Sequence, residues 1–85
     1  GGGRFPFMTD FGPAEILRIL SVTDSLGIHR EAIRIPLDNQ GEGSLRLVQG
    51  GRMIEIVAPG VGDFDAWLAA LPARIAALDL SHVRR

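Results

Sequence analysis

The sequence predicts a single small α+β domain, with an N-terminal helix, a three-stranded antiparallel meander, and a C-terminal helical pair or kinked helix. Three observations predict this order. An apolar pattern with helical spacing follows Pro13, two alternating segments flank Gly50-Gly51, and a second helical pattern follows Asp63. We expect the helices to cover one face of the sheet, because its apolar face has to be buried against another element.

The composition is that of a small domain without disulfides. The 85 residues include no cysteine and carry a formal net charge of -1, which argues against broad electrostatic attachment to nucleic acid. No apolar run reaches the length of a membrane span, about 18 residues. Every basic residue is Arg, as in proteins of GC-rich genomes, and we expect a bacterial, cytoplasmic protein. Residues 1–7 read as a cloning remnant ahead of a start at Met8, and residues 8–85 as the domain.

The first half predicts one helix and one strand. Pro13 suits the first position of a helix, Glu15 suits its first turn, and Gly27 is a natural stop. The segment Ile33–Leu37 then alternates apolar residues with others, as a half-buried strand does. Pro36 has no N–H to donate to a ladder, so this strand is expected at a sheet edge.

The segment Leu45–Val57 predicts a hairpin closed by a two-residue Gly50-Gly51 turn. This turn sets the register, with one apolar face toward the core and a charge-complementary pair on the other face. The expected pairs are Gln49 with Arg52, Val48 with Met53, Leu47 with Ile54, Arg46 with Glu55, and Leu45 with Ile56.

The C-terminal part predicts a helix that begins after Asp63, a good N-cap residue. Its apolar stripe contains Pro72, which disfavours an unbroken helix, so we expect a kink there or two short helices. Residues 81–85 are expected to fray. The stripe consists of Phe64, Trp67, Leu68, Leu71, Ile75 and Leu78.

No pattern predicts an enzyme, a metal site or a cofactor. The polar segment 38–49 partly follows the spacing of a calcium loop, but Gln49 stands where the bidentate Glu belongs. The glycine-containing loop 59–63 lacks the residues of a phosphate-binding loop. His29 and His82 have no neighbouring nucleophile or carboxylate in a relay pattern.

The segment Ser44–Gly60, followed by Leu68, Leu71, Ile75 and Leu78, resembles the β-hairpin docking domains of megasynthases. Their hairpin typically ends in an Ala-Pro step before a Leu-rich helical pair, as Ala58-Pro59 does here. The resemblance implies a module that captures a short peptide of another subunit. The segment 28–43 adds a strand and a loop that the family pattern lacks.

A DNA-binding regulator is the alternative. The segment Leu26–Arg34 resembles the turn and recognition helix of a helix-turn-helix, with the hairpin as a wing. The resemblance implies base contacts by His29, Arg30 and Arg34. Pro36 would end that helix after two turns.

We expect a non-enzymatic module that binds another polypeptide, or a second copy of itself, at a sheet edge. In a meander the strand Arg52–Val57 lies at an edge and has no Pro or Lys to discourage pairing. The high apolar fraction, 46%, also favours a partner surface. The predicted partner-binding residues are Arg46, Arg52, Met53, Glu55 and Val57, with both arginines selecting an acidic peptide.

Overall fold

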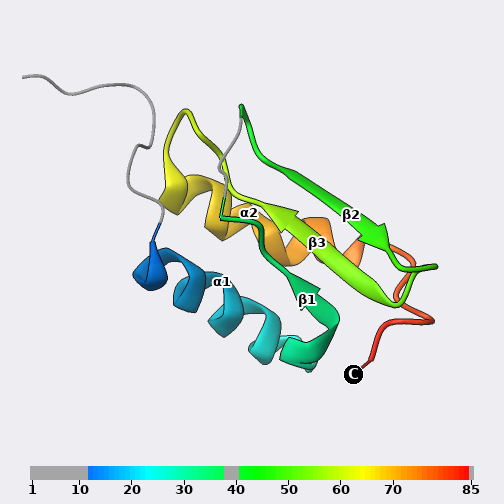
Figure 1. The fold of residues 1–85 in the computed structure, drawn as a ribbon. Coiled ribbons are helices and arrows are strands. Elements are labelled where there is room, and N and C mark those ends of the chain that lie inside the picture. The colour runs from blue at the N-terminus through cyan, green and yellow to red at the C-terminus, as the bar shows by residue number, and fades with distance from the viewer. Residues whose placement is uncertain (1–11, 38–40, 85) are drawn as a thin grey trace, which may run out of the picture.

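The computed structural model describes residues 12–37 and 41–84 and confirms the α+β class. The expected remnant at residues 1–7 lies outside the described residues. Helices α1 and α2 pack against one face of a three-stranded sheet (Figure 1). The elements are α1 (Pro13–Ser25), the 3-10 turn η1 (Arg30–Ala32), β1 (Ile33–Arg34), β2 (Ser44–Val48), β3 (Met53–Val57) and α2 (Phe64–Ala76).

Helix α1 begins and ends where its sequence signals predict. Pro13 is its first residue, and the Gly12 N–H donates to Glu15 Oε1 at 2.9 Å, which satisfies one of the free donors of the first turn. At the other end Gly27 has a φ of 76°, a left-handed conformation that stops the helix after Leu26.

The strand predicted over Ile33–Leu37 is shorter than expected. Only Ile33 and Arg34 pair, and residues 30–32 before them form a single 3-10 turn. Pro36 gives the physical reason for the short strand, because it has no N–H to extend a ladder. The prediction of a recognition helix, made for the DNA-binding alternative, is wrong. The residues that follow Gly27, up to Arg34, form a 3-10 turn and a short strand and no α-helix.

The sheet is mixed, and its strand order corrects the predicted antiparallel meander. The order is β1-β3-β2, with β1 parallel to β3 and β2 antiparallel to it. Ile33 lies opposite Ile54, and Arg34 lies opposite Glu55. The central position falls to the more deeply buried strand, since three consecutive residues of β3 are buried whereas β2 alternates with exposed residues. The prediction that β1 lies at an edge is confirmed.

The predicted hairpin register is confirmed in β2 and β3. Val48 pairs with Met53, Leu47 with Ile54, Arg46 with Glu55, and Leu45 with Ile56. The Arg52 N–H donates to the Gln49 carbonyl at 3.3 Å, which closes the turn. Gln49, Gly50 and Gly51 have φ values of 55°, 68° and 86°, and the two glycines adopt this left-handed backbone without a Cβ penalty.

Helix α2 is one helix rather than a pair. Asp63 caps it by accepting the Asp65 N–H at 2.9 Å, as predicted, and the helix continues through Pro72 to Ala76. Leu71 and Ile75, on either side of Pro72, are fully buried, so their packing offsets the hydrogen bond that proline cannot make. The expected fraying after residue 80 is also wrong up to Arg84, because Val83 is only 7% exposed.

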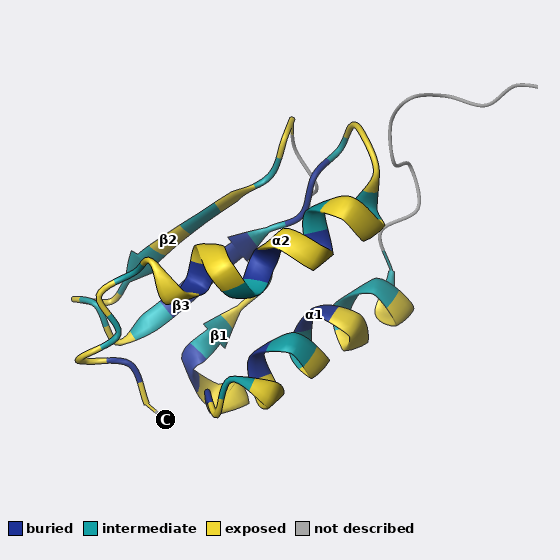
Figure 2. Ribbon diagram, turned by 180° about the vertical axis from the view of Figure 1, so that it is seen from behind, coloured by how far each residue is buried: buried dark blue, intermediate teal, exposed yellow. Residues whose placement is uncertain are grey.

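The core lies between the helices and the sheet (Figure 2). Ile54 and Ile56 of β3 point into it, and residues of both helices and of the C-terminal segment complete it. Its buried members are Ile19, Ile28, Ala32, Ile54, Ile56, Leu68, Leu71, Ile75 and Val83. The fold thus leaves the other face of the sheet uncovered by either helix.

Candidate interaction surface

The uncovered side of the sheet, here called the open face, has a row of three charges at its centre. Glu55 of β3 lies between Arg34 of β1 and Arg46 of β2. Its Oε1 accepts from Arg46 Nε at 2.7 Å, and its Oε2 lies 3.4 Å from Arg34 Nε. Glu55 is 8% exposed, whereas the two arginine side chains are 68% and 60% exposed. The row therefore presents two guanidinium groups around one largely covered carboxylate.

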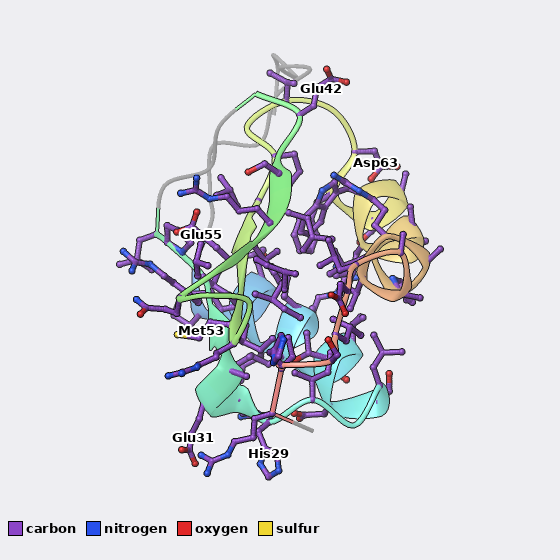
Figure 3. The ribbon with its side chains drawn as sticks, turned by 90° about the vertical axis from the view of Figure 1, so that its right-hand side faces the viewer. His29, Glu31, Glu42, Met53, Glu55 and Asp63 are labelled. Atoms are coloured by element: carbon purple, nitrogen blue, oxygen red, sulfur yellow. The ribbon has the colours of Figure 1, made fainter. Side chains whose placement is uncertain are left out.

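Smaller and apolar side chains flank this row. Val48 pairs with Met53 at the turn end of the hairpin, and Ser44 pairs with Val57 at the other end. Val48, Met53 and Val57 are half-buried, and Ser44 is exposed. In Figure 3, Glu55 and Met53 lie on the side of the sheet away from α2. The open face consequently combines apolar contact area with a net positive centre.

Four of the five predicted partner-binding residues belong to this open face. Because side chains alternate along a strand, Met53, Glu55 and Val57 point to one side of β3, and Arg46 points to the same side from β2. Arg52 instead lies in the turn, exposed, at the end of the sheet. The structure thus brings four of the five residues together on the open face and places Arg52 beside Met53 at the turn end.

The proposed edge, however, was assigned to the wrong strand. β3 has β1 on one side and β2 on the other, so the protein's own chain pairs with the predicted free edge at Ile54 and Glu55. Among the described residues, β2 is the longer of the two edge strands. It has five residues, and one of its sides is unpaired. The opposite edge, β1, has two residues and is followed closely by Pro36. Strand β2 is therefore the better template for an added strand.

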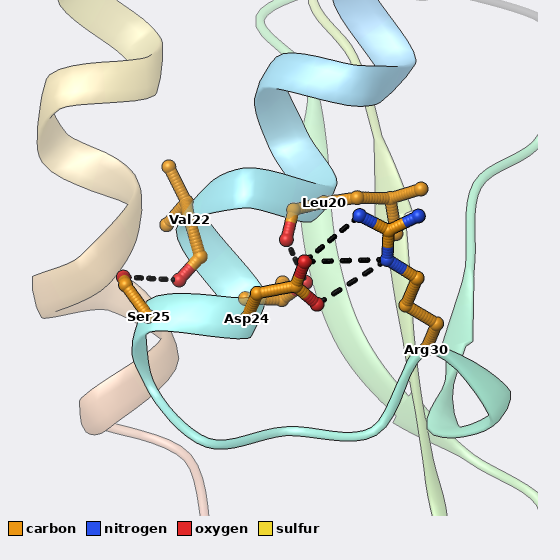
Figure 4. A network of polar contacts seen from close by, with 6 residues as sticks. Leu20, Val22, Asp24, Ser25 and Arg30 are labelled. Carbon is orange, nitrogen blue, oxygen red and sulfur yellow. Dashed lines mark hydrogen bonds and ion pairs between the residues drawn. The ribbon is translucent and has the colours of Figure 1, made fainter.

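The residues assigned to DNA contact are used within the fold. Arg30 donates to the Asp24 carboxylate, with the shortest contact, from its Nη2, at 2.8 Å (Figure 4). This hydrogen bond from Arg30 holds the pKa of Asp24 below its ordinary value. Arg34 is engaged with Glu55, and His29 is exposed beside the turn. These contacts give the two arginines structural partners.

The glycine-containing loop before α2 also has a structural role. The N–H groups of Gly60 and Val61 both donate to the Gly41 carbonyl, at 2.9 and 3.1 Å. This joins the loop to the start of the β2 region. The Asp38 end of the segment compared with a calcium loop lies outside the described residues. Within residues 12–37 and 41–84, no group of three His, Asp or Glu side chains is close enough to hold a metal ion.

A pocket of about 480 Å³ opens at the turn end of the sheet, where the C-terminal segment meets η1 and the hairpin turn. Its charged members, apart from Arg52, were not predicted as site residues. The sequence offers no signal for them, because Glu31 and Arg84 are 53 positions apart yet in contact. The pocket is lined by Glu31, Ala32, Arg52, Met53, His82 and Arg84.

Neither helix of the described chain has the length and apolar character needed to cross a membrane. Comparisons with protein-family models, with curated proteins and with solved structures gave no significant match.

Proposed function

We propose that this protein is a non-enzymatic interaction module, working in the cytoplasm, that binds a partner polypeptide as an additional strand along the outer edge of β2. The observation that carries the proposal is the position of β2 as a five-residue strand at the end of the sheet, beside the open face. An edge strand has backbone N–H and C=O groups that an added strand can pair with. The resemblance to β-hairpin docking domains points to the same class of function.

Arg46 favours an acidic partner. Its Nε is engaged with Glu55 at 2.7 Å, but a guanidinium has further N–H donors. A carboxylate on the added strand, opposite Arg46, would accept from these donors in a charge-assisted cross-strand pair. The half-buried Val48 would contact an apolar residue two positions away on the same face.

Arg46 also argues against self-pairing as the main mode. In a two-fold antiparallel pair of β2 strands centred on Arg46, the two arginines would lie directly opposite each other, and like charges in that position destabilise a sheet. A register centred on Leu47 would place Arg46 opposite Val48 and give the guanidinium no carboxylate. Both registers are therefore poorer than a strand with an acidic residue facing Arg46.

The test is selection of linear peptides from a displayed random library on the full chain, followed by affinity measurement on synthetic peptides. We expect enriched peptides to alternate apolar residues with Asp or Glu. Arg46→Gln should weaken their binding by about tenfold, the equivalent of one charge-assisted contact. Arg74→Gln is the matched control, because Arg74 is exposed on α2, away from the sheet edge, and should leave affinity unchanged.

The contrary outcomes are equally specific. Enriched peptides that bind Arg46→Gln as well as the unchanged protein would overturn the role of β2. A concentration-dependent dimer in sedimentation velocity that excludes the peptides would replace the partner polypeptide with a second copy of the chain. The circular dichroism spectrum of each variant is compared with that of the unchanged protein, to confirm that the variant folds, before affinities are compared. The DNA-binding alternative lacks its recognition helix, because Arg30–Ala32 form a 3-10 turn.

A further inference from the structure

The pocket at the turn end of the sheet is built by segments that are distant in the sequence. Ala32, buried at 3% exposure, and half-buried Met53 provide apolar lining. Charged and imidazole groups come from η1, the hairpin turn and the C-terminal segment. Figure 3 shows Glu31 and Met53 at the same end of the molecule. The volume of the pocket, about 480 Å³, lies in the range of small-ligand sites.

The C-terminal segment is fixed in position by its own contacts. The Asp79 carboxylate accepts from the Ser81 hydroxyl at 2.7 Å and from the Ser81 N–H at 3.1 Å, which turns the chain after α2. Val83 then inserts into the core, and the His29 N–H donates to the Arg84 carbonyl at 3.2 Å. His82 and Arg84 are therefore presented to the pocket by an anchored segment.

The charges that line the pocket are unevenly balanced. Arg52 and Arg84 are cationic, His82 adds an imidazole, and Glu31 is the one acidic member of the lining. Glu31 pairs with Arg84 through Nη1 at 3.0 Å, and both side chains are mostly exposed, at 77% and 65%. No ion pair joins Arg52 to an acidic side chain of residues 12–37 and 41–84, whereas Arg84 is paired with Glu31.

We propose that this pocket binds a carboxylate, and that in function the carboxylate is an acidic side chain of the partner polypeptide. The second half rests on the proposed function. Arg52, exposed in the lining, supplies a positive charge, and Arg84 has guanidinium donors beyond the one that meets Glu31. Met53 and Ala32 contact the methylene groups that carry the carboxylate. Glu31 competes with the ligand for Arg84 and sets a ceiling on its affinity.

The experiment is an NMR titration of the full chain with N-acetyl-aspartate methylamide, and with the matching asparagine compound as the neutral control. We expect saturable shifts at Gly51, Met53 and Arg84 with the aspartate compound only. Arg52→Gln should weaken binding by about tenfold, and Glu31→Gln should strengthen it, because a competing carboxylate is removed. Arg74→Gln should match the unchanged protein.

Equal shifts with the asparagine compound, or an unchanged affinity in Arg52→Gln, would overturn the carboxylate site. Weaker binding in Glu31→Gln would also contradict it, because Glu31 would then be contributing to the site rather than competing. The result is separable from the proposed function. Carboxylate binding at the pocket without peptide binding at β2 contradicts the proposed function and the partner polypeptide as the source of the carboxylate, but not the carboxylate site. The reverse result contradicts only the pocket.

Discussion

The Nε of Arg46 lies 2.7 Å from Oε1 of Glu55 and joins an exposed side chain of the edge strand to a buried carboxylate of the central strand. The contact extends the Arg46 side chain over the open face toward β3, and it compensates a charge that the sheet covers. The same residue thus stabilises the fold and marks the surface proposed for a partner.

The row of charges predicts a graded loss of stability. Arg46→Gln should cost only about 0.5–1 kcal/mol, because Arg34 remains and both arginine side chains are largely exposed. Arg34→Gln with Arg46→Gln should cost about 2–3 kcal/mol, because the Glu55 carboxylate then has no positive partner. Urea unfolding measures both. Adding Glu55→Gln should recover at least part of the loss, and a triple variant no more stable than the double would contradict this account.

We expect a steric penalty when Gly43 is replaced by Ala, and replacement of Gly27 is the control for backbone strain. A Cβ at Gly43 would lie 2.8 Å from the Val57 carbonyl oxygen and 3.0 Å from Trp67 Nε1, whereas a Cβ at Gly27 meets nothing within 4 Å. Both residues have positive φ, 80° and 76°. Gly27→Ala should therefore cost about 1–2 kcal/mol from backbone strain alone, and Gly43→Ala about 1–3 kcal/mol more. Equal losses in urea unfolding would contradict the packing described at Gly43.

We expect the ring of Trp67 to contribute to stability and its N–H group not to. Its Nε1 is buried with no hydrogen-bond partner among the described residues, while the ring packs 5.6 Å from that of Phe64. Trp67→Ala should cost about 3–5 kcal/mol. Trp67→Phe should cost less than about 1.5 kcal/mol, because it keeps apolar contact and removes the unsatisfied donor. If thermal and urea unfolding find the two variants equally unstable, the N–H has a role that this structure does not give it.

We expect the pKa of Asp79 to depend on its hydrogen bonds with Ser81. The Ser81 hydroxyl, its N–H and the nearby His82 charge hold the pKa of Asp79 below its ordinary value. Its contribution to stability is present above the pKa of the unfolded chain and is lost as pH falls through the lowered folded value. In Ser81→Ala the pKa of Asp79 should rise toward the ordinary value, as followed by carboxyl NMR shifts. Asp24, held by Arg30, is the internal control and should not change.

The sequence predicted those parts of the fold that depend on neighbouring residues. Pro13, Glu15 and Gly27 fixed the ends of α1, and Gly50-Gly51 fixed the hairpin register, because capping and turn chemistry act within a few positions. At Pro72 a kink or a division into two helices was predicted. The helix is not divided there, because the flanking residues are buried, and burial is a tertiary effect.

Strand order was not predictable from the same signals. The parallel pair of Ile33 with Ile54 joins residues that are far apart in the chain, and the alternation of either strand fits an edge as well as a centre. The four open-face residues followed from the hairpin register alone. The pocket did not, because residues that line it together, such as Glu31 and Arg84, are 53 positions apart in the chain.

The central claim, that β2 and not β3 carries the free edge, is tested most directly by amide hydrogen exchange resolved by residue. In the free protein, alternate amides over Ser44–Val48 should exchange fast, while Ile54 and Glu55, which have a paired strand on each side, should be protected. A bound peptide from the library should slow the fast amides of β2 and leave β3 unchanged. Uniform protection of β2 in the free monomer, with fast alternate amides in β3, would contradict the strand order and the proposed site together.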